Sequence, residues 1–152
     1  MSTLTLEHTL EIAKPPQVVF DYLAHHPNHV KFVEQNLTCE QVSPGPMGVG
    51  TELKNTAKMF GALGGRIEEH FAVTAFDPPR LLSKASQEGS SFDTTDSFEL
   101  APSGDGTRLT MRVTVSTSSL AKRLLMGLMK PVVHGAMKKS TSTLKAILET
   151  KA

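Results

Sequence analysis

Apolar and polar residues alternate in successive segments along most of this chain, and this pattern constrains the fold more than any other feature. The first segment, LTLEHTLEI at residues 4–12, has an apolar side chain at every even position except His8. A period of two is typical of a β-strand with one buried face, so the chain is expected to form about six or seven strands. The other segments expected to form strands lie at residues 37–42, 51–59, 66–76, 81–87, 91–100 and 107–116, and the alternation is weak at 81–87.

Turn residues separate several of these segments. GALGG at 61–65 and SGDG at 103–106 are typical of hairpins, and DPPR at 77–80 is a turn built on prolines. Hairpins join neighbouring strands that run in opposite directions. The strands are therefore expected to form an antiparallel sheet.

Two short helices are expected after the first strand. AKPPQVVFDYLA at 13–24 opens with two prolines, of which Pro16 suits the first turn of a helix. Its apolar residues recur at helical spacing until Pro27, which ends the pattern. NHVKFVEQ at 28–35 is interpreted as the second short helix.

The last 35 residues predict one long helix that begins near Ser118 or Ser119. Pro131 lies inside this helix and is expected to kink it, so that it wraps a curved surface. We predict that the buried stripe shifts at the proline by roughly a quarter turn. Before Pro131 the predicted stripe comprises Ala121, Leu124, Leu125, Leu128 and Val132; after it, Val133, Ala136, Met137, Leu144, Ile147 and Leu148. The polar side carries His134, Lys138, Ser142, Lys145 and Glu149.

The element order predicts an α+β protein in which hairpin-linked strands are flanked by helices. A length of 152 residues fits a single domain spanning 1–152, and 39% hydrophobic residues is a globular composition. A sheet this long is expected to curl around the final helix. A curled sheet that holds a kinked helix tends to leave space between the two.

Cysteine usage and the chain termini suggest a location. Cys39 is the only cysteine, which excludes an internal disulfide and a cysteine-based zinc site. A reducing compartment is the natural setting, so we expect a cytoplasmic protein. The N-terminus does not read as a signal peptide, and no apolar run is long enough to span a membrane.

Charge is unevenly distributed along the chain. Residues 118–152 contain seven Lys or Arg and one acidic residue, Glu149, whereas the first 117 residues contain nine basic and fourteen acidic residues. Such asymmetry is compatible with nucleic acid, with an anionic surface or with a solvated helix face. Because the basic stretch has no interleaved aromatic residues, no nucleic-acid partner is expected.

Several short motifs, taken in order, resemble one known family. They are IAKPPQVVFDYL at 12–23, GPMGVGT at 45–51, FDPPRLL at 76–82, FEL at 98–100, GTRLT at 106–110 and LKAILE at 144–149. On these residues the chain resembles the START-like (SRPBCC) superfamily, which includes the birch-pollen-related (Bet v 1-like) allergens and the bacterial polyketide cyclase/dehydrase proteins. Members often carry a tryptophan in the second short helix, where this chain has Phe32.

The resemblance implies a helix-grip fold, in which a curved antiparallel sheet of about six or seven strands wraps a long C-terminal helix. It also implies a deep cavity for an apolar molecule such as a lipid, a sterol or a polyketide. Some members are cyclases or dehydratases, and others are carriers.

Four polar residues are predicted to face this cavity: His8, Asn55, Glu69 and Asp96. Each lies on the mostly apolar face of its strand, where a polar group needs a partner. They would orient the polar end of a ligand, or satisfy one another inside a packed core. For Glu69 a one-residue slip in register would reverse the assignment, because Glu68 and His70 lie on the opposite face.

Apolar side chains are predicted to supply the affinity for this ligand. We expect binding or transport of a small hydrophobic molecule, with no cofactor and no metal. The alternative is a polyketide cyclase or dehydratase that uses His8 and Asp96 as acid and base. A further alternative is a module that binds a protein or a membrane surface through the basic C-terminal helix. The predicted apolar ligand-binding residues are Leu6, Leu53, Phe71, Phe98, Met111, Val113, Met137 and Leu144.

Three histidines close in sequence were considered as metal ligands. His25 and His29 are four residues apart, but Pro27 argues against one continuous helix and no acidic ligand is adjacent. We therefore predict that His25, His26 and His29 lie in a surface loop near the mouth of the cavity. The glycine-rich GPMGVG at 45–50 precedes a strand rather than a helix, so it is not interpreted as a phosphate-binding loop.

Overall fold

The computed structural model describes residues 2–58, 65–87 and 93–150 of the chain. Most of the predicted hairpin turn at 61–65, the end of the predicted strand at 59 and the start of the one at 91–92 lie outside the described residues.

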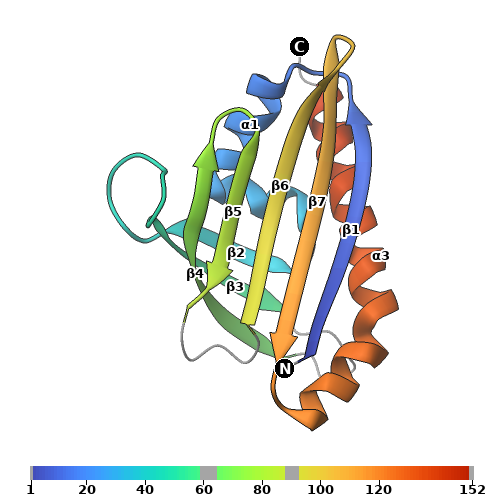
Figure 1. Ribbon diagram of the computed structural model, residues 1–152. Coiled ribbons are helices and arrows are strands. Elements are labelled where there is room, and N and C mark those ends of the chain that lie inside the picture. The colour runs from blue at the N-terminus through green and yellow to red at the C-terminus, as the bar shows by residue number, and fades with distance from the viewer. Residues whose placement is uncertain (1, 59–64, 88–92, 151–152) are drawn as a thin grey trace.

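Seven antiparallel strands form one sheet, as the alternating pattern predicts (Figure 1). Along the sheet the order is β1-β7-β6-β5-β4-β3-β2, so every neighbouring pair except β1 and β7 is also consecutive in sequence. The strands are β1 (Ser2–Ile12), β2 (Asn36–Gln41), β3 (Glu52–Lys58), β4 (Arg66–Asp77), β5 (Leu81–Ser86), β6 (Asp93–Ser103) and β7 (Gly106–Thr117).

Three short helical segments lie between β1 and β2, and one long helix follows β7. The first is α1 (Pro16–Ala24), which begins at the predicted proline. The predicted second helix at 28–35 is shorter and is split into η1 (His26–Asn28) and α2 (His29–Phe32). The long helix is α3 (Leu120–Thr150), and the Ser119 hydroxyl accepts a hydrogen bond from the Lys122 backbone N–H (3.4 Å), as an N-terminal cap does.

Strand register places one set of side chains on the inner face of the sheet, the face toward α3. Residues paired directly across antiparallel strands point to the same face. Leu6 pairs with Val113, Val113 with Asp96, and Asp96 with Lys84, which makes a row across four strands. Asn55 pairs with Glu69. The predicted inner faces of these strands are therefore confirmed, including that of Glu69, for which a slip was considered.

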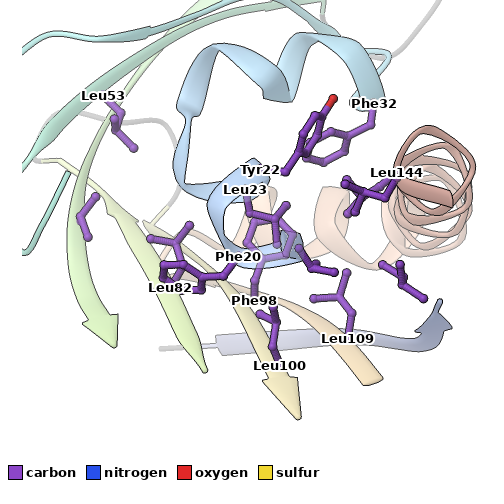
Figure 2. Packing of buried hydrophobic residues seen from close by; sticks show 14 of the residues in the cluster. Phe20, Tyr22, Leu23, Phe32, Leu53, Leu82, Phe98, Leu100, Leu109 and Leu144 are labelled. Carbon is purple, nitrogen blue, oxygen red and sulfur yellow. The ribbon is translucent and has the colours of Figure 1, made fainter. Parts of the chain in front are cut away.

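The main hydrophobic core lies between the helices and one end of the sheet. Figure 2 shows Leu144 of α3 directed toward Tyr22 of α1 and Phe32 of α2. Phe20, Leu109 and Leu144 are each at most 1% exposed. The same cluster includes Leu148 near the C-terminal end of α3, so this half of the helix is packed against the rest of the molecule.

The stripe predicted for the first half of α3 is wrong. Leu124, Leu125 and Leu128 are 65%, 48% and 76% exposed, whereas Met126 is 8% exposed. Because Leu144 and Leu148 fix which face of the second half meets the core, the helical period determines the face of the first half. Counting back from Leu144 in steps of three and four gives Ser140, Met137, Val133, Met129 and Met126, which form one continuous inward stripe.

The predicted stripe after Pro131 agrees with the structure, since Met137, Leu144 and Leu148 are buried. Within the described residues, no helix combines the length and the apolar character that crossing a membrane requires.

Candidate functional site

A cavity of about 460 Å³ lies between the inner face of the sheet and the first half of α3. Pockets that hold small molecules typically have volumes of about 300–1,000 Å³. All seven strands contribute side chains to one side, and α3 lines the other with Met126, Met129, Val133 and Met137. The methionines suit a flexible ligand, since an unbranched thioether adapts to irregular shapes.

Among the described residues, the exposed part of the cavity lining lies at the end of β3 and on the first half of α3, here called the cavity opening. Its lining includes Lys58 of β3 and both Leu125 and Lys130 of α3, and all three side chains are exposed. The opposite end approaches the buried helices, because His29 of α2 also belongs to the lining.

Nine of the twelve predicted ligand-binding residues line this cavity. The polar ones are Asn55, Glu69 and Asp96, and the apolar ones are Leu6, Phe71, Phe98, Met111, Val113 and Met137. His8, Leu53 and Leu144 lie outside the lining. Leu53 and Leu144 belong to the main core, whereas His8 is partly buried on the inner face of β1, where it pairs with Met111 of β7.

One polar cluster stands out within the apolar lining: Asn55, Glu69, Lys84 and Asp96. Lys84 is its only cation, with its Nζ 3.8 Å from Asp96 Oδ2 and 4.5 Å from the centre of the Phe71 ring. The Lys84 and Asp96 side chains are 12% and 21% exposed, so most of their hydration is lost. A buried ion pair is costly to desolvate, and the aromatic face offers the ammonium a second favourable contact.

Burial changes the acidity of both carboxyl groups in the cluster. It raises the pKa of Asp96, and Lys84 opposes that rise through its charge and a hydrogen bond. It also raises the pKa of Glu69, where the Lys84 charge opposes the shift and the Asp96 charge reinforces it. These two groups hold protons more readily than ordinary surface carboxyls, which is a feature of acid–base and ligand-binding sites.

Two buried histidines, His26 and His29, adjoin this polar cluster, and their predicted placement in a surface loop is wrong. His26 and His29 are only 2% and 4% exposed. His26 Nε2 donates to Asn55 Oδ1 (2.6 Å), because an amide oxygen can only accept, and His29 Nε2 donates to the Leu23 carbonyl (2.8 Å). The turn at Pro27 brings both rings inward, with their centres 4.7 Å apart.

Both histidine rings are neutral at ordinary pH. Burial, followed by the Lys84 charge, lowers the pKa of His26 to about 4, although the Asn55 hydrogen bond opposes this. Burial also lowers the pKa of His29, with the Lys84 and His26 charges adding to the effect. The cluster therefore offers one ammonium, one amide and two carboxyls, a mixture of donors and acceptors for the polar end of an apolar molecule.

Other reactive residue types have no comparable arrangement in the described part of the chain. Burial raises the pKa of the Cys39 thiol to about 11, so this buried cysteine stays protonated. No group of three or more His, Cys, Asp and Glu side chains is arranged to hold a metal ion among the described residues.

Sequence reasoning missed Lys84, although a signal for it was present. Lys84 follows Leu82 at a spacing of two in a predicted strand, so it shares the inner face with a core leucine. A charged residue at such a position is a candidate site residue for the same reason as Asp96. The burial of His26 and His29 had no such signal, because it depends on how the turn folds over the sheet.

Comparisons with known proteins agree with this fold. Residues 3–149 match the family described as polyketide cyclase / dehydrase and lipid transport. A search of the curated proteins found no match.

Three solved structures illustrate the likeness. The Zhui aromatase/cyclase from Streptomyces sp. R1128 has a TM-score of 0.79 at 13% identity, with 97% of this chain and 94% of that one covered. The di-domain ARO/CYC BexL from the BE-7585A biosynthetic pathway has a TM-score of 0.77 at 15% identity, with 99% and 51% covered. Ara h 8.0201 has a TM-score of 0.68 at 16% identity, with 99% and 100% covered. At these identities the likeness shows a shared fold.

The seven-stranded sheet, the long C-terminal helix and the match over residues 3–149 lead to one assignment. The chain has the START-like helix-grip fold and belongs to the polyketide cyclase / dehydrase and lipid transport family.

Proposed function

We propose that the protein binds a small apolar molecule with a polar end in the cavity between its sheet and α3. One observation carries this proposal: a cavity of about 460 Å³ is lined mainly by apolar side chains and contains a buried cluster of polar groups. Apolar surface supplies affinity in such pockets, and a few fixed polar groups set the orientation. The family description, which names lipid transport, supports the same class of ligand.

The polar cluster would orient the ligand in this proposal. Lys84 would donate to a carbonyl or hydroxyl oxygen, and the Glu69 or Asp96 carboxylate would accept from a hydroxyl group. The ligand would thus combine an apolar body with an oxygen-bearing end. His8, which lies outside the lining, would act on the ligand only after a change in side-chain position.

Native mass spectrometry of the purified protein tests the proposal first. An adduct of a few hundred daltons that is released on denaturation, and that partitions into organic solvent, supports it. A titration with the neutral apolar dye Nile red gives a second readout that needs no co-purified ligand. Lys84→Met keeps the stem of the side chain and removes its charge, so it should change the preference among ligands with different polar ends. A protein without adduct that also fails to bind Nile red would contradict the proposal.

A second candidate is a cyclase or dehydratase that uses the same cavity. The observation that favours it is the raised pKa of Asp96 and Glu69 beside the Lys84 ammonium. A carboxylate with a raised pKa is a stronger base than usual, and a nearby ammonium stabilises negative charge that develops on a carbonyl oxygen. In this reading Asp96 would move the proton and Lys84 would stabilise the oxyanion. Asp96→Asn should then abolish turnover of a polyketide-like substrate while Nile red binding persists.

A further inference from the structure

The first half of α3 presents a row of large apolar side chains to solvent. Leu120, Leu124, Leu128 and Val132, here called the outer row, follow one another at four-residue intervals and are 45–76% exposed. Residues three and four apart lie on the same side of a helix. The opposite side of the same turns carries Met126 and Met129, which line the cavity. This half of α3 is therefore apolar on two sides, and the described residues cover only one of them.

Exposure of this kind indicates an interaction surface. Single exposed apolar residues are ordinary on proteins, but a contiguous row of four on one helix is not. Figure 1 shows this part of α3 at the edge of the molecule, beyond β1 and beside the end of the sheet where the chain begins.

The charges that α3 itself carries around the outer row are of one sign. No acidic residue occurs between Asp105 and Glu149, so α3 has none until its last turn. Arg123 is exposed close to Leu120 and Leu124, and Lys138 is exposed farther along the same side of the helix. Three more exposed cations, Lys58, Arg66 and Lys130, lie on the elements that flank the cavity opening.

This charge pattern decides which partner fits. A second copy joined through a twofold axis would bring the same cations face to face, and like charges in an interface repel. An anionic lipid surface suits both the apolar row and the cations of this helix. Its headgroups attract the cations, and its acyl chains accept the apolar side chains.

We propose that the outer row and its flanking cations bind the surface of a membrane that contains anionic phospholipid. Leu120, Leu124 and Leu128 enter the boundary between headgroups and acyl chains, and Arg123 and Lys138 contact the lipid phosphates. Leu125 is exposed next to the outer row and also lines the cavity, so the docked helix holds the cavity opening close to the bilayer. That last step rests on the proposed function, whereas the docking itself does not.

Co-sedimentation with vesicles tests the docking. The wild-type protein is expected to bind vesicles of phosphatidylcholine mixed with phosphatidylserine, and to bind vesicles of phosphatidylcholine alone far more weakly. Binding should weaken as salt is added, because surface charges are screened. Each basic residue near such a surface is worth about fivefold in affinity, so Arg123→Gln/Lys138→Gln should bind about 25-fold more weakly.

Leu124→Gln/Leu128→Gln removes two side chains of the outer row and should lower the affinity by at least about tenfold. Matched controls change similar residues elsewhere on the surface. Val42→Gln/Val49→Gln alters two exposed apolar residues beside the loop before β3, and Lys31→Gln/Arg80→Gln removes two exposed cations. Both control proteins should bind like the wild type. All altered side chains are exposed, and circular dichroism verifies that each variant is folded.

Three results would overturn the proposal. One is equal or absent binding of the wild type to both kinds of vesicle. Another is unchanged binding by Leu124→Gln/Leu128→Gln. The third is a wild-type dimer in light scattering that the same double substitution converts to a monomer, because the outer row would then be an interface between two copies.

Discussion

Both partners of the hydrogen bond between His26 and Asn55 are buried, so the loss of either side chain should lower the stability of the fold. His26 and Asn55 are 2% and 3% exposed, and their Nε2 and Oδ1 atoms are 2.6 Å apart. Asn55→Ala would leave the ring N–H without this acceptor, at a cost of about 1–3 kcal/mol in the free energy of unfolding. Urea denaturation measures this cost. Thr56→Ala, on the opposite face of β3, is the control, and an equal loss in both variants would contradict the prediction.

The His26 ring should also make stability depend on pH. Burial and the Lys84 charge lower its pKa to about 4 in the folded protein, below the unfolded value of about 6.5. The folded state therefore binds fewer protons between these values, so this contribution is complete above about pH 6.5 and is lost as the pH falls toward about 4. Glu69 and Asp96, whose pKa values are raised, act with the opposite sign in the acidic range.

A comparison of the wild type with His26→Gln isolates this effect from the carboxyl groups. The free energy of unfolding of the wild type should fall relative to that of the variant by up to about 3 kcal/mol between neutral pH and about pH 4. Urea denaturation at a series of pH values measures the difference. If the two proteins lose stability in parallel, His26 does not titrate as its environment indicates.

At the scale of elements, β7 begins where there is no room for a side chain. A Cβ on Gly106 would collide with the backbone carbonyl oxygen of Ile12 at the end of β1. A backbone atom cannot rotate away, so Gly106→Ala should destabilise the protein by about 1–3 kcal/mol. The contrast is Gly127 of α3, where a Cβ meets nothing within 4 Å and alanine favours the helix by up to about 1 kcal/mol. Thermal unfolding should move in opposite directions for the two variants, and a shared direction would contradict the argument.

A polar tie holds the C-terminal end of α3 against the end of β1. Glu149 Oε2 accepts from the Ala13 backbone N–H (2.8 Å) and from Lys145 Nζ (2.6 Å), and Lys145 also donates to the Glu11 carbonyl (2.6 Å). These hydrogen bonds lower the pKa of Glu149, with Lys145 as the larger cause. The tie is therefore complete above the ordinary pKa of a glutamate and weakens as the pH falls through the lowered value.

Glu149→Gln should loosen this end of the helix without unfolding the sheet. Hydrogen exchange should become faster in the last turns of α3 and stay unchanged in β6 and β7. Glu40→Gln, on the exposed side of β2, is the matched control. Unchanged exchange in the last turns of α3 would mean that packing of Leu144 and Leu148 alone holds the helix end.

The strands of this fold are far easier to predict than the faces of its helix. A period of two leaves only two assignments for each strand, and a buried neighbour such as Phe71 or Phe98 selects one, which is why Glu69 and Asp96 could be placed on the inner face. In α3 both sides of the first half are apolar, so periodicity alone could not decide whether the outer row or the side with Met126 and Met129 faces the sheet. Which row meets the sheet follows from Leu144 and Leu148, one to two dozen residues farther along.

Only part of the site could be predicted, because some of its contacts do not follow from local periodicity. Asn55, Glu69 and Asp96 interrupt clear alternating patterns, and such interruptions can be read directly. His26 and His29 lie outside the alternating segments, and their burial arises from the short turns at Pro27 that fold α2 over the sheet. Contacts of this kind are set by the path of the backbone in space.

The whole molecule divides along α3 into a packed half and an open half. Leu144 and Leu148 join the main core with α1 and α2, whereas Met137 belongs to a small cluster with Leu6 and Val113 beside the cavity. The packed half fixes the helix, and the open half leaves the space in which a ligand would lie. A side chain added to the open half should therefore behave differently from one added to the core.

Val115→Trp tests this division directly. Val115 is partly buried on β7 and lines the cavity, so the larger ring can occupy existing space. In a packed core such an enlargement costs about 1–3 kcal/mol, but in the cavity it should leave the thermal midpoint unchanged or higher. Nile red binding should weaken by at least about tenfold, since the ring takes the ligand's place. Because the chain has no other tryptophan, a blue-shifted emission spectrum would verify that the ring is buried.

The control for this substitution is Val18→Trp on the exposed side of α1, which should bind Nile red like the wild type and emit at the wavelength of a solvated indole. A destabilised Val115→Trp protein that still binds the dye with wild-type affinity would contradict the division of the molecule. It would mean that the space beside Val115 is closed in solution and that the dye binds elsewhere.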